Sequence, residues 1–121
     1  MGHCLIVDDS RTIRRVERKM IEALGFDACE AEDGHDALAQ CAVEMPALVL
    51  LDWVMPNMDG LEFLKALRRL PGGHAPRVIF CTSQVDMSFV SRAIEAGADE
   101  FVMKPFDAET LNAKLAEVGL V

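Results

Sequence analysis

Short apolar segments alternate with longer amphipathic segments along the whole chain. The short segments are residues 3–7, 27–32, 47–51, 77–81 and 99–103. Four of them are dense in Val, Ile, Leu, Phe or Met, which is typical of strands buried on both faces. The second alternates polar with small apolar residues, which favours an edge strand. We therefore predict five β-strands, with residues 27–32 at an edge of the sheet.

The longer segments have the spacing of amphipathic helices. In the first, residues 10–24, the apolar positions that share one face are Ile13, Val16, Met20 and Leu24. Arginine and lysine side chains fill the opposite face. Ser10 is a suitable N-cap, and Gly25 is a suitable C-terminal stop. Further helices are predicted at residues 34–44, 60–70, 86–96 and 107–118.

Strict alternation of strands and helices predicts an α/β fold, in which helices cover both faces of a parallel sheet. Right-handed crossovers place the carboxyl ends of all the strands at one edge of the sheet. Ligands of such sheets bind at that edge, so the residues that follow each strand are the first place to look for chemistry.

Ionisable and hydroxyl side chains follow the first, third, fourth and fifth predicted strands. They are Asp8 and Asp9 after the first, Asp52 after the third, Thr82 and Ser83 after the fourth, and Lys104 after the fifth. Each alone has a structural explanation, because Asp9 or Thr82 can cap a helix, Asp52 can begin a turn and Lys104 can be solvated. Together they bring carboxylates, a hydroxyl and an ammonium group to one edge.

Clustered carboxylates repel one another, so the cluster needs a proton or a cation. Oxygen ligands without His or Cys favour Mg²⁺. Lys104 opposite a metal ion then calls for an anion between them, and phosphate can bridge Mg²⁺, Lys104 and the Thr82 hydroxyl. Asp52 ends the most hydrophobic strand, and a carboxylate held there can attack phosphorus to give an acyl phosphate.

Composition narrows the range of partners and compartments. The 121 residues suit one domain, residues 1–121, and 20 acidic against 12 basic side chains give a net charge of -8. We expect no binding of nucleic acid or anionic membrane, since phosphate backbones need a basic surface. There is no apolar run of about 18 residues that could span a membrane. The first residues reach two carboxylates before a signal peptide could form, which favours a cytoplasmic location.

Cysteine and histidine usage agrees with that location. The cysteines show no zinc-ligand spacing and are predicted to be reduced thiols in the core: Cys4, Cys29, Cys41 and Cys81. The histidines are dispersed, so no metal or catalytic role is expected for His3, His35 or His74.

Three motifs in this order resemble the response-regulator receiver domain over essentially the whole chain. They are VDDS near the start, DWVMPNMDG in the middle and GADEFVMKPF near the end. The chain is most similar to stand-alone chemotaxis-type (CheY-like) receivers. The resemblance implies a doubly wound, flavodoxin-like sheet of order 2-1-3-4-5 with five helices, and a monomer without an output domain. It also implies a phosphorylation switch that is not a turnover enzyme on an external substrate.

The resemblance assigns roles to the residues at the strand ends. Asp52 matches the phosphoacceptor, Asp9 a direct Mg²⁺ ligand, and Asp8 an acidic partner that acts largely through water. The backbone carbonyl of Val54 would complete the protein ligands. Lys104 matches the counter-ion of the phosphoryl group.

Further roles concern the switch and the surface that it controls. Thr82 matches the hydroxyl that moves onto the phosphoryl group, and Phe101 the aromatic side chain that swings inward with it. Pro105 matches a position that usually follows a cis peptide bond. The predicted output surface is the fourth helix, the fifth strand and the fifth helix.

This chain departs from the commoner family pattern at three positions. Val54 and Gln84 each stand two residues beyond a site residue, where the family's side chains influence access of the hydrolytic water. An apolar Val54 cannot orient water, so we expect slow self-dephosphorylation. Phe101 lacks the hydroxyl of a tyrosine, so its switch would depend on packing.

The expected partners are a histidine kinase or histidine phosphotransfer protein and a downstream protein. The basic face of the first helix fits either donor docking or simple solvation, and residues 85–96 with Phe101 form a second candidate surface.

Two other functions fit this sequence less well. A haloacid-dehalogenase-type phosphatase would need an acidic residue where Val54 stands. A flavodoxin-like FMN carrier would need a phosphate loop, whereas the first turn is Asp8-Asp9-Ser10.

Overall fold

The computed structural model describes residues 2–55, 57–83 and 87–121. In this part of the chain, five parallel strands form one sheet in the order β2-β1-β3-β4-β5. The strands are β1 (His3–Val7), β2 (Asp27–Ala31), β3 (Leu48–Asp52), β4 (Arg77–Thr82) and β5 (Glu100–Met103). The predicted fold class, the strand order and the edge position of β2 are confirmed. Two strands run one residue further than predicted, so Asp52 and Thr82 are their last residues.

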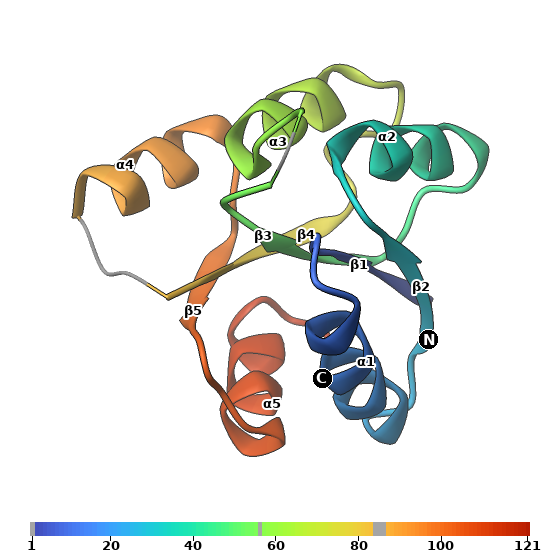
Figure 1. The fold of residues 1–121 in the computed structure, drawn as a ribbon, viewed down its shortest axis with the longest axis vertical. Coiled ribbons are helices and arrows are strands. Elements are labelled where there is room, and N and C mark those ends of the chain that lie inside the picture. Colours follow the sequence, from blue (N-terminus) through green and yellow to red (C-terminus); the bar gives the residue numbers. More distant parts are fainter. Residues whose placement is uncertain (1, 56, 84–86) are drawn as a thin grey trace.

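The helices cover both faces of the sheet. They are α1 (Arg11–Ala23), α2 (Gly34–Val43), α3 (Gly60–Arg69), α4 (Met87–Ala96) and α5 (Ala108–Glu117). Helices α1 and α5 lie on one face, and α2, α3 and α4 lie on the other (Figure 1). Ser10 is the N-cap of α1, as predicted, and Asp107, the predicted first residue of the last helix, is the N-cap of α5. Asp86, the predicted start of the fourth helix, lies outside the described residues.

Alternating strand side chains build a core on each side of the sheet. In β1, Leu5 and Val7 join the core beneath α2 and α3, whereas Cys4 and Ile6 join the core beneath α1 and α5. Strands β3 and β4 repeat this alternation, and their apolar residues are 0–2% exposed. Both faces of the central strands are therefore dry, which holds their carboxyl ends in fixed positions. None of the helices described here is long and apolar enough to cross a membrane.

One cysteine departs from the prediction. Cys4, Cys41 and Cys81 are buried free thiols, but Cys29 is exposed. The prediction of a core thiol is wrong for Cys29 because β2 is an edge strand, and alternate side chains of that strand face solvent.

Helix α1 is rotated from its predicted orientation. Its buried residues are Glu17 and Ile21, whereas Val16, which was predicted on the core face, is 46% exposed. Glu17 lies one helical turn after Ile13 and one before Ile21, so it occupies the middle of the buried stripe. The opposite face is not uniformly solvated either, because Arg14 is largely buried in an ion pair with Glu30 at 3.0 Å.

Gly60 lets α3 begin directly against the end of β3. Its backbone N–H donates to the carbonyl oxygen of Trp53 at 2.9 Å. A Cβ atom at this position would overlap the backbone oxygen of Asp52 and lie 2.8 Å from Cε1 of Phe80. Because the overlap is with backbone, no side-chain movement relieves it.

Gly60→Ala is expected to lower the free energy of unfolding by about 2 kcal/mol, because it forces the loop away from the end of β3. Urea denaturation of the variant and the wild type at one pH measures the difference. Equal midpoints and slopes would show that the loop accommodates the methyl group.

The buried Glu17 also makes stability depend on pH. Burial, with a smaller contribution from Asp8 and Asp52, raises the pKa of Glu17 from 4.5 to about 7 against the opposing effect of Lys104. The folded state therefore holds a proton that the unfolded chain releases at lower pH. Ionisation of this carboxyl should cost stability as the pH rises from about 4.5 to about 7, and the cost should level off above that range.

Glu17→Gln should remove this cost. The free energy of unfolding of the variant, relative to that of the wild type, should therefore rise by about 2 to 3 kcal/mol when the pH is raised from about 5 to about 8. Urea denaturation at both pH values measures the gain. Glu22→Gln, which changes an exposed carboxylate of the same helix, is the control. Parallel stability curves for wild type and Glu17→Gln would contradict the assignment.

Candidate functional site

The carboxyl ends of four strands bring the predicted side chains together. Asp8 and Asp9 directly follow β1, Asp52 and Thr82 end β3 and β4, and Lys104 directly follows β5. All five line one cavity of about 320 Å³. This convergence follows from the parallel topology, since every strand points the same way.

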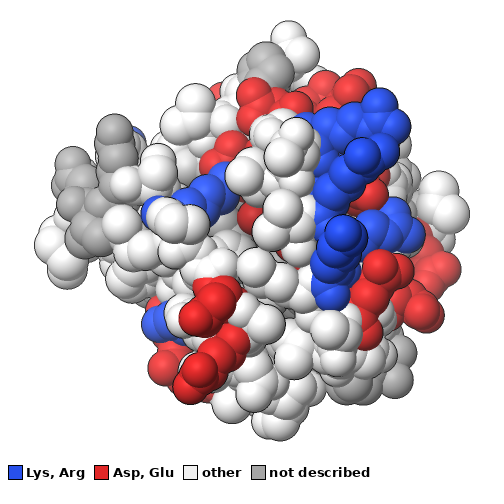
Figure 2. All heavy atoms as spheres, turned by 60° about the horizontal axis from the view of Figure 1, so that its bottom comes forward, with Lys and Arg blue, Asp and Glu red and all other residues white. Residues whose placement is uncertain are grey.

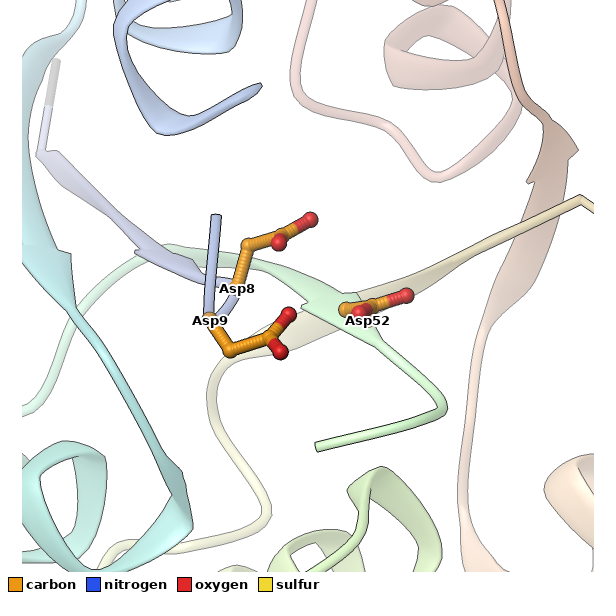
Figure 3. Close-up of side chains that lie close together, drawn as sticks. All are labelled: Asp8, Asp9 and Asp52. Carbon is orange, nitrogen blue, oxygen red and sulfur yellow. The ribbon is translucent and has the colours of Figure 1, made fainter. Parts of the chain in front are cut away.

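Three carboxylates lie close together at this edge (Figure 3). One oxygen each from Asp8, Asp9 and Asp52 lies within 4.8 Å of the other two. Asp8 is 2% exposed, Asp52 is half-buried and Asp9 is exposed. The cluster therefore has a buried side and a side that is open to solvent.

Lys104 neutralises part of this charge. Its Nζ donates to Oδ2 of Asp8 at 2.7 Å and to Oδ1 of Asp52 at 3.1 Å. Burial works against the ammonium form, but the hydrogen bond to Asp8 and the charges of Asp52 and Asp8 outweigh it and raise the pKa of Lys104. Lys104 is therefore a permanent cation that ties β1 to β3.

Asp8 is held by groups on three elements. Its Oδ1 accepts from the backbone N–H of Ser10 at 2.8 Å, and its own N–H donates to the Ala31 carbonyl at 3.2 Å. Arg14 donates from Nη1 to the Asp8 carbonyl at 2.7 Å. The bond from Ser10 compensates part of the burial of the carboxylate, and the other two bonds fix the backbone that carries it.

Asp52 retains an oxygen that Lys104 does not engage. Burial raises the pKa of Asp52, Lys104 opposes this shift, and the charges of Asp8 and Asp9 add to it. The carboxylate is thus moderately destabilised by its neighbours. An incoming cation at this point would relieve the repulsion.

Apolar side chains also line the cavity. Its apolar members are Ile13, Trp53, Val54 and Phe89. Val54 is 75% exposed. Because its side chain is apolar, it cannot hydrogen-bond a water molecule at that position. Gln84, the other position singled out in the sequence, lies outside the described residues.

Sequence reasoning missed an aromatic stack beside Asp52. The Trp53 ring lies 4.9 Å from Phe80 and 4.8 Å from Phe89, and the Arg92 guanidinium lies 5.8 Å from the centre of the Trp53 ring. The stack joins β3 to α4 through side chains that are distant in sequence. No local pattern signals such a contact.

The remaining predicted residues, Phe101 and Pro105, lie on β5 and just after it. The Lys104–Pro105 peptide bond is cis, as the resemblance implied. Phe101 is half-buried and does not line the cavity, and the Lys114 ammonium lies 5.5 Å from its ring centre. The backbone N–H of Lys104 donates to the Thr82 carbonyl at 2.7 Å, which links the ends of β4 and β5.

The donor set suits a hard divalent cation. The three clustered side chains offer only carboxylate oxygens, and neither His nor Cys takes part. Mg²⁺ prefers such ligands and keeps several waters, for which the exposed side of the cluster leaves room. The residues present therefore fit Mg²⁺ beside a fixed ammonium group, an arrangement that can bind a phosphoryl group.

Comparisons with known proteins agree with this geometry. Residues 4–116 match the family described as the response regulator receiver domain. The phosphate regulon transcriptional regulatory protein PhoB of Klebsiella pneumoniae is 35% identical over 114 residues, which cover 94% of this chain and 50% of that protein. PhoB of Escherichia coli is 34% identical over the same length. The chain spans about half the length of the curated relatives that it matches.

Solved structures are similar over nearly the whole chain. Chemotaxis protein CheY4 of Vibrio cholerae has a TM-score of 0.93 and 30% identity, and the match covers 98% of both chains. A CheY-like receiver domain protein from Methanospirillum hungatei has a TM-score of 0.88 and 29% identity, covering 98% of this chain and 93% of that one. The chain therefore belongs to the response-regulator receiver domains, the phosphoryl-accepting modules of two-component signalling.

Proposed function

We propose that residues 1–121 act as one receiver domain in which Asp52 accepts a phosphoryl group from a phosphohistidine. The observation that carries the proposal is the Asp52 carboxylate held 3.1 Å from the Lys104 ammonium within a cluster of acidic oxygens. In the transfer, an Asp52 oxygen forms a bond to phosphorus as the bond from phosphorus to the histidine nitrogen breaks. Lys104 stays protonated and faces the negative charge that arrives.

The acidic residues would hold Mg²⁺ during this transfer. Asp9 and Asp52 are the proposed direct side-chain ligands, Asp8 acts largely through water, and the Val54 carbonyl completes the protein ligands. When bound, Mg²⁺ supplies positive charge that lets clustered anions accept another anionic group. The buried position of Asp8 and the exposed position of Asp9 suit these two roles.

Phosphorylation would change a partner-binding surface. Thr82 lines the same cavity as Asp52, and its carbonyl is bonded to the N–H of Lys104, so movement there reaches the end of β5. Phe101 on β5 is the proposed aromatic switch. Nearby apolar side chains are exposed on α4 and β5: Met87 is 71% exposed, Ile94 51% and Met103 37%. These side chains suit a downstream protein that binds α4, β5 and α5.

Receivers of this family interact with histidine kinases and downstream targets. We propose that a histidine kinase or histidine phosphotransfer protein docks against α1. Arg14 and Arg18 are already paired with Glu30, which leaves Arg11, Arg15 and Lys19 exposed. Figure 2 shows basic side chains gathered in a ridge on one side of the molecule. The ridge would attract an acidic partner surface.

We further propose that the domain acts as a monomer. It assists its own phosphorylation and dephosphorylation and turns over no external substrate. The acidic cluster and the net charge of -8 disfavour nucleic acid and membrane surfaces as partners.

Acetyl phosphate with Mg²⁺ should add the mass of one phosphoryl group to the wild type, as intact-protein mass spectrometry would show. Asp52→Ala should gain nothing, whereas Asp27→Ala, which changes an exposed aspartate on β2, should behave like the wild type. Trp53 directly follows Asp52, so its fluorescence should respond to Mg²⁺ and again to phosphorylation. Equal labelling of Asp52→Ala would disprove the assignment of the acceptor.

Val54→Asn should speed loss of the phosphoryl group about fivefold, because an amide can hydrogen-bond the attacking water where Val54 cannot. The decay of phosphorylated protein after removal of acetyl phosphate measures the rate. Val43→Asn, at a valine that is 89% exposed on α2, is the matched control. An unchanged decay rate in Val54→Asn would show that water access is set elsewhere.

A further inference from the structure

A second cavity of about 320 Å³ lies between α1 and the loops that follow β4 and β5. Most of its walls are apolar: Ile13, Val16, Met20, Pro105 and Phe106. Among its lining residues only Glu17 and Lys104 carry ionisable side chains. Lys104 lines both this cavity and the cavity that contains Asp52, so it lies between Glu17 and the acidic cluster.

Glu17 is an unusual acidic residue within this protein. It is 4% exposed, and its carboxyl group makes no side-chain hydrogen bond or ion pair with another residue in the described part of the chain. By contrast, Glu22 and Glu30 on the same side of the sheet are paired with arginines. A carboxyl group without a partner costs stability at this position, so packing alone does not account for it.

Among the ionisable groups around this cavity, Glu17 is the group expected to change charge near neutral pH. Burial raises the pKa of Glu17 to about 7. The charge of Lys104 opposes this shift, and the charges of Asp8 and Asp52 add to it. From β1 and β4, Cys4 and Cys81 also face Glu17, and burial raises the pKa of both thiols, which therefore stay neutral. None of the three histidines lines either cavity.

We propose that Glu17 is a positioning residue for Lys104, holding the ammonium group in competition with the phosphoryl group. The inference rests on the proposed function of Asp52. In the structure Lys104 is bonded to Asp8 and Asp52. Once those carboxylates are engaged by a divalent cation, their hold on the lysine weakens. Asp9, which lines the first cavity with Lys104, is a proposed ligand of the same cation. The carboxyl group that remains in a cavity with Lys104 is Glu17, which can then retain the ammonium group until a phosphoryl group arrives.

The proposal predicts opposite effects on two measurable properties. An ionised Glu17 adds negative charge beside the site, so it should strengthen Mg²⁺ binding. The same charge opposes an anionic phosphoryl group and competes for Lys104, so it should slow phosphorylation. Loss of packing alone would not strengthen one property while weakening the other.

The test compares Glu17→Gln with the wild type at about pH 6 and about pH 8. At the higher pH the variant should bind Mg²⁺ about fivefold more weakly, as Trp53 fluorescence would report. It should also accept phosphate from acetyl phosphate about fivefold faster at saturating Mg²⁺. At the lower pH, where Glu17 is protonated, both differences should shrink to less than about twofold. Glu17→Leu, which suits the apolar cavity, should reproduce both effects, and Glu22→Gln should show neither.

Effects that do not change with pH, that run in the same direction for both properties, or that Glu22→Gln shares would overturn the inference. The proposed function fails separately. If the wild type never gains a phosphoryl group at Asp52, that function is wrong, and the Mg²⁺ titrations alone then decide whether Glu17 acts on the site. If the wild type is phosphorylated and Glu17→Gln matches it at both pH values, only the role of Glu17 is lost.

Discussion

The ammonium group of Lys104 lies between the carboxylates of Asp8 and Asp52, at 2.7 Å and 3.1 Å, and the rest of the site depends on this bridge. Three carboxylates within 4.8 Å of one another would otherwise destabilise the end of the sheet. The bridge makes it possible to bury Asp8 almost completely. It does not neutralise the cluster, however, and the remaining negative charge suits a divalent cation.

The hydrophobic core makes this arrangement rigid. Alternating side chains of β1, β3 and β4 are buried on both faces, so the strand ends cannot separate to relieve repulsion. Helix α1 contacts the site from one side, because Arg14 bonds the Asp8 carbonyl and Glu17 shares a cavity with Lys104. The aromatic stack on Trp53 connects the other side to α4. The strand ends are thereby in contact with both α1 and α4, the helices proposed to bind partners.

The sequence was sufficient to predict the sheet and the convergence of Asp8, Asp52 and Lys104, because parallel topology brings strand ends together whatever the side-chain details. It was insufficient where the outcome depends on small rotations or on packing between distant segments. A helix with apolar residues at both Val16 and Met20 can bury either flank, and the buried stripe runs through Glu17 instead. The spacing of Ile13, Glu17 and Ile21 was the available signal. For Cys29 the available signal was the predicted edge position of its strand, whereas the contact between Trp53 and Phe89 had none.

Charge balance explains why a residue outside the ligand set can matter. Three carboxylates and one ammonium leave two negative charges, which one divalent cation would neutralise. The acyl phosphate proposed for Asp52 would then add negative charge to a balanced site. An ionised carboxyl in the neighbouring cavity increases that excess, whereas a protonated one does not. Because Glu17 is the buried carboxyl whose pKa lies near 7, its protonation decides how unfavourable the phosphorylated state is.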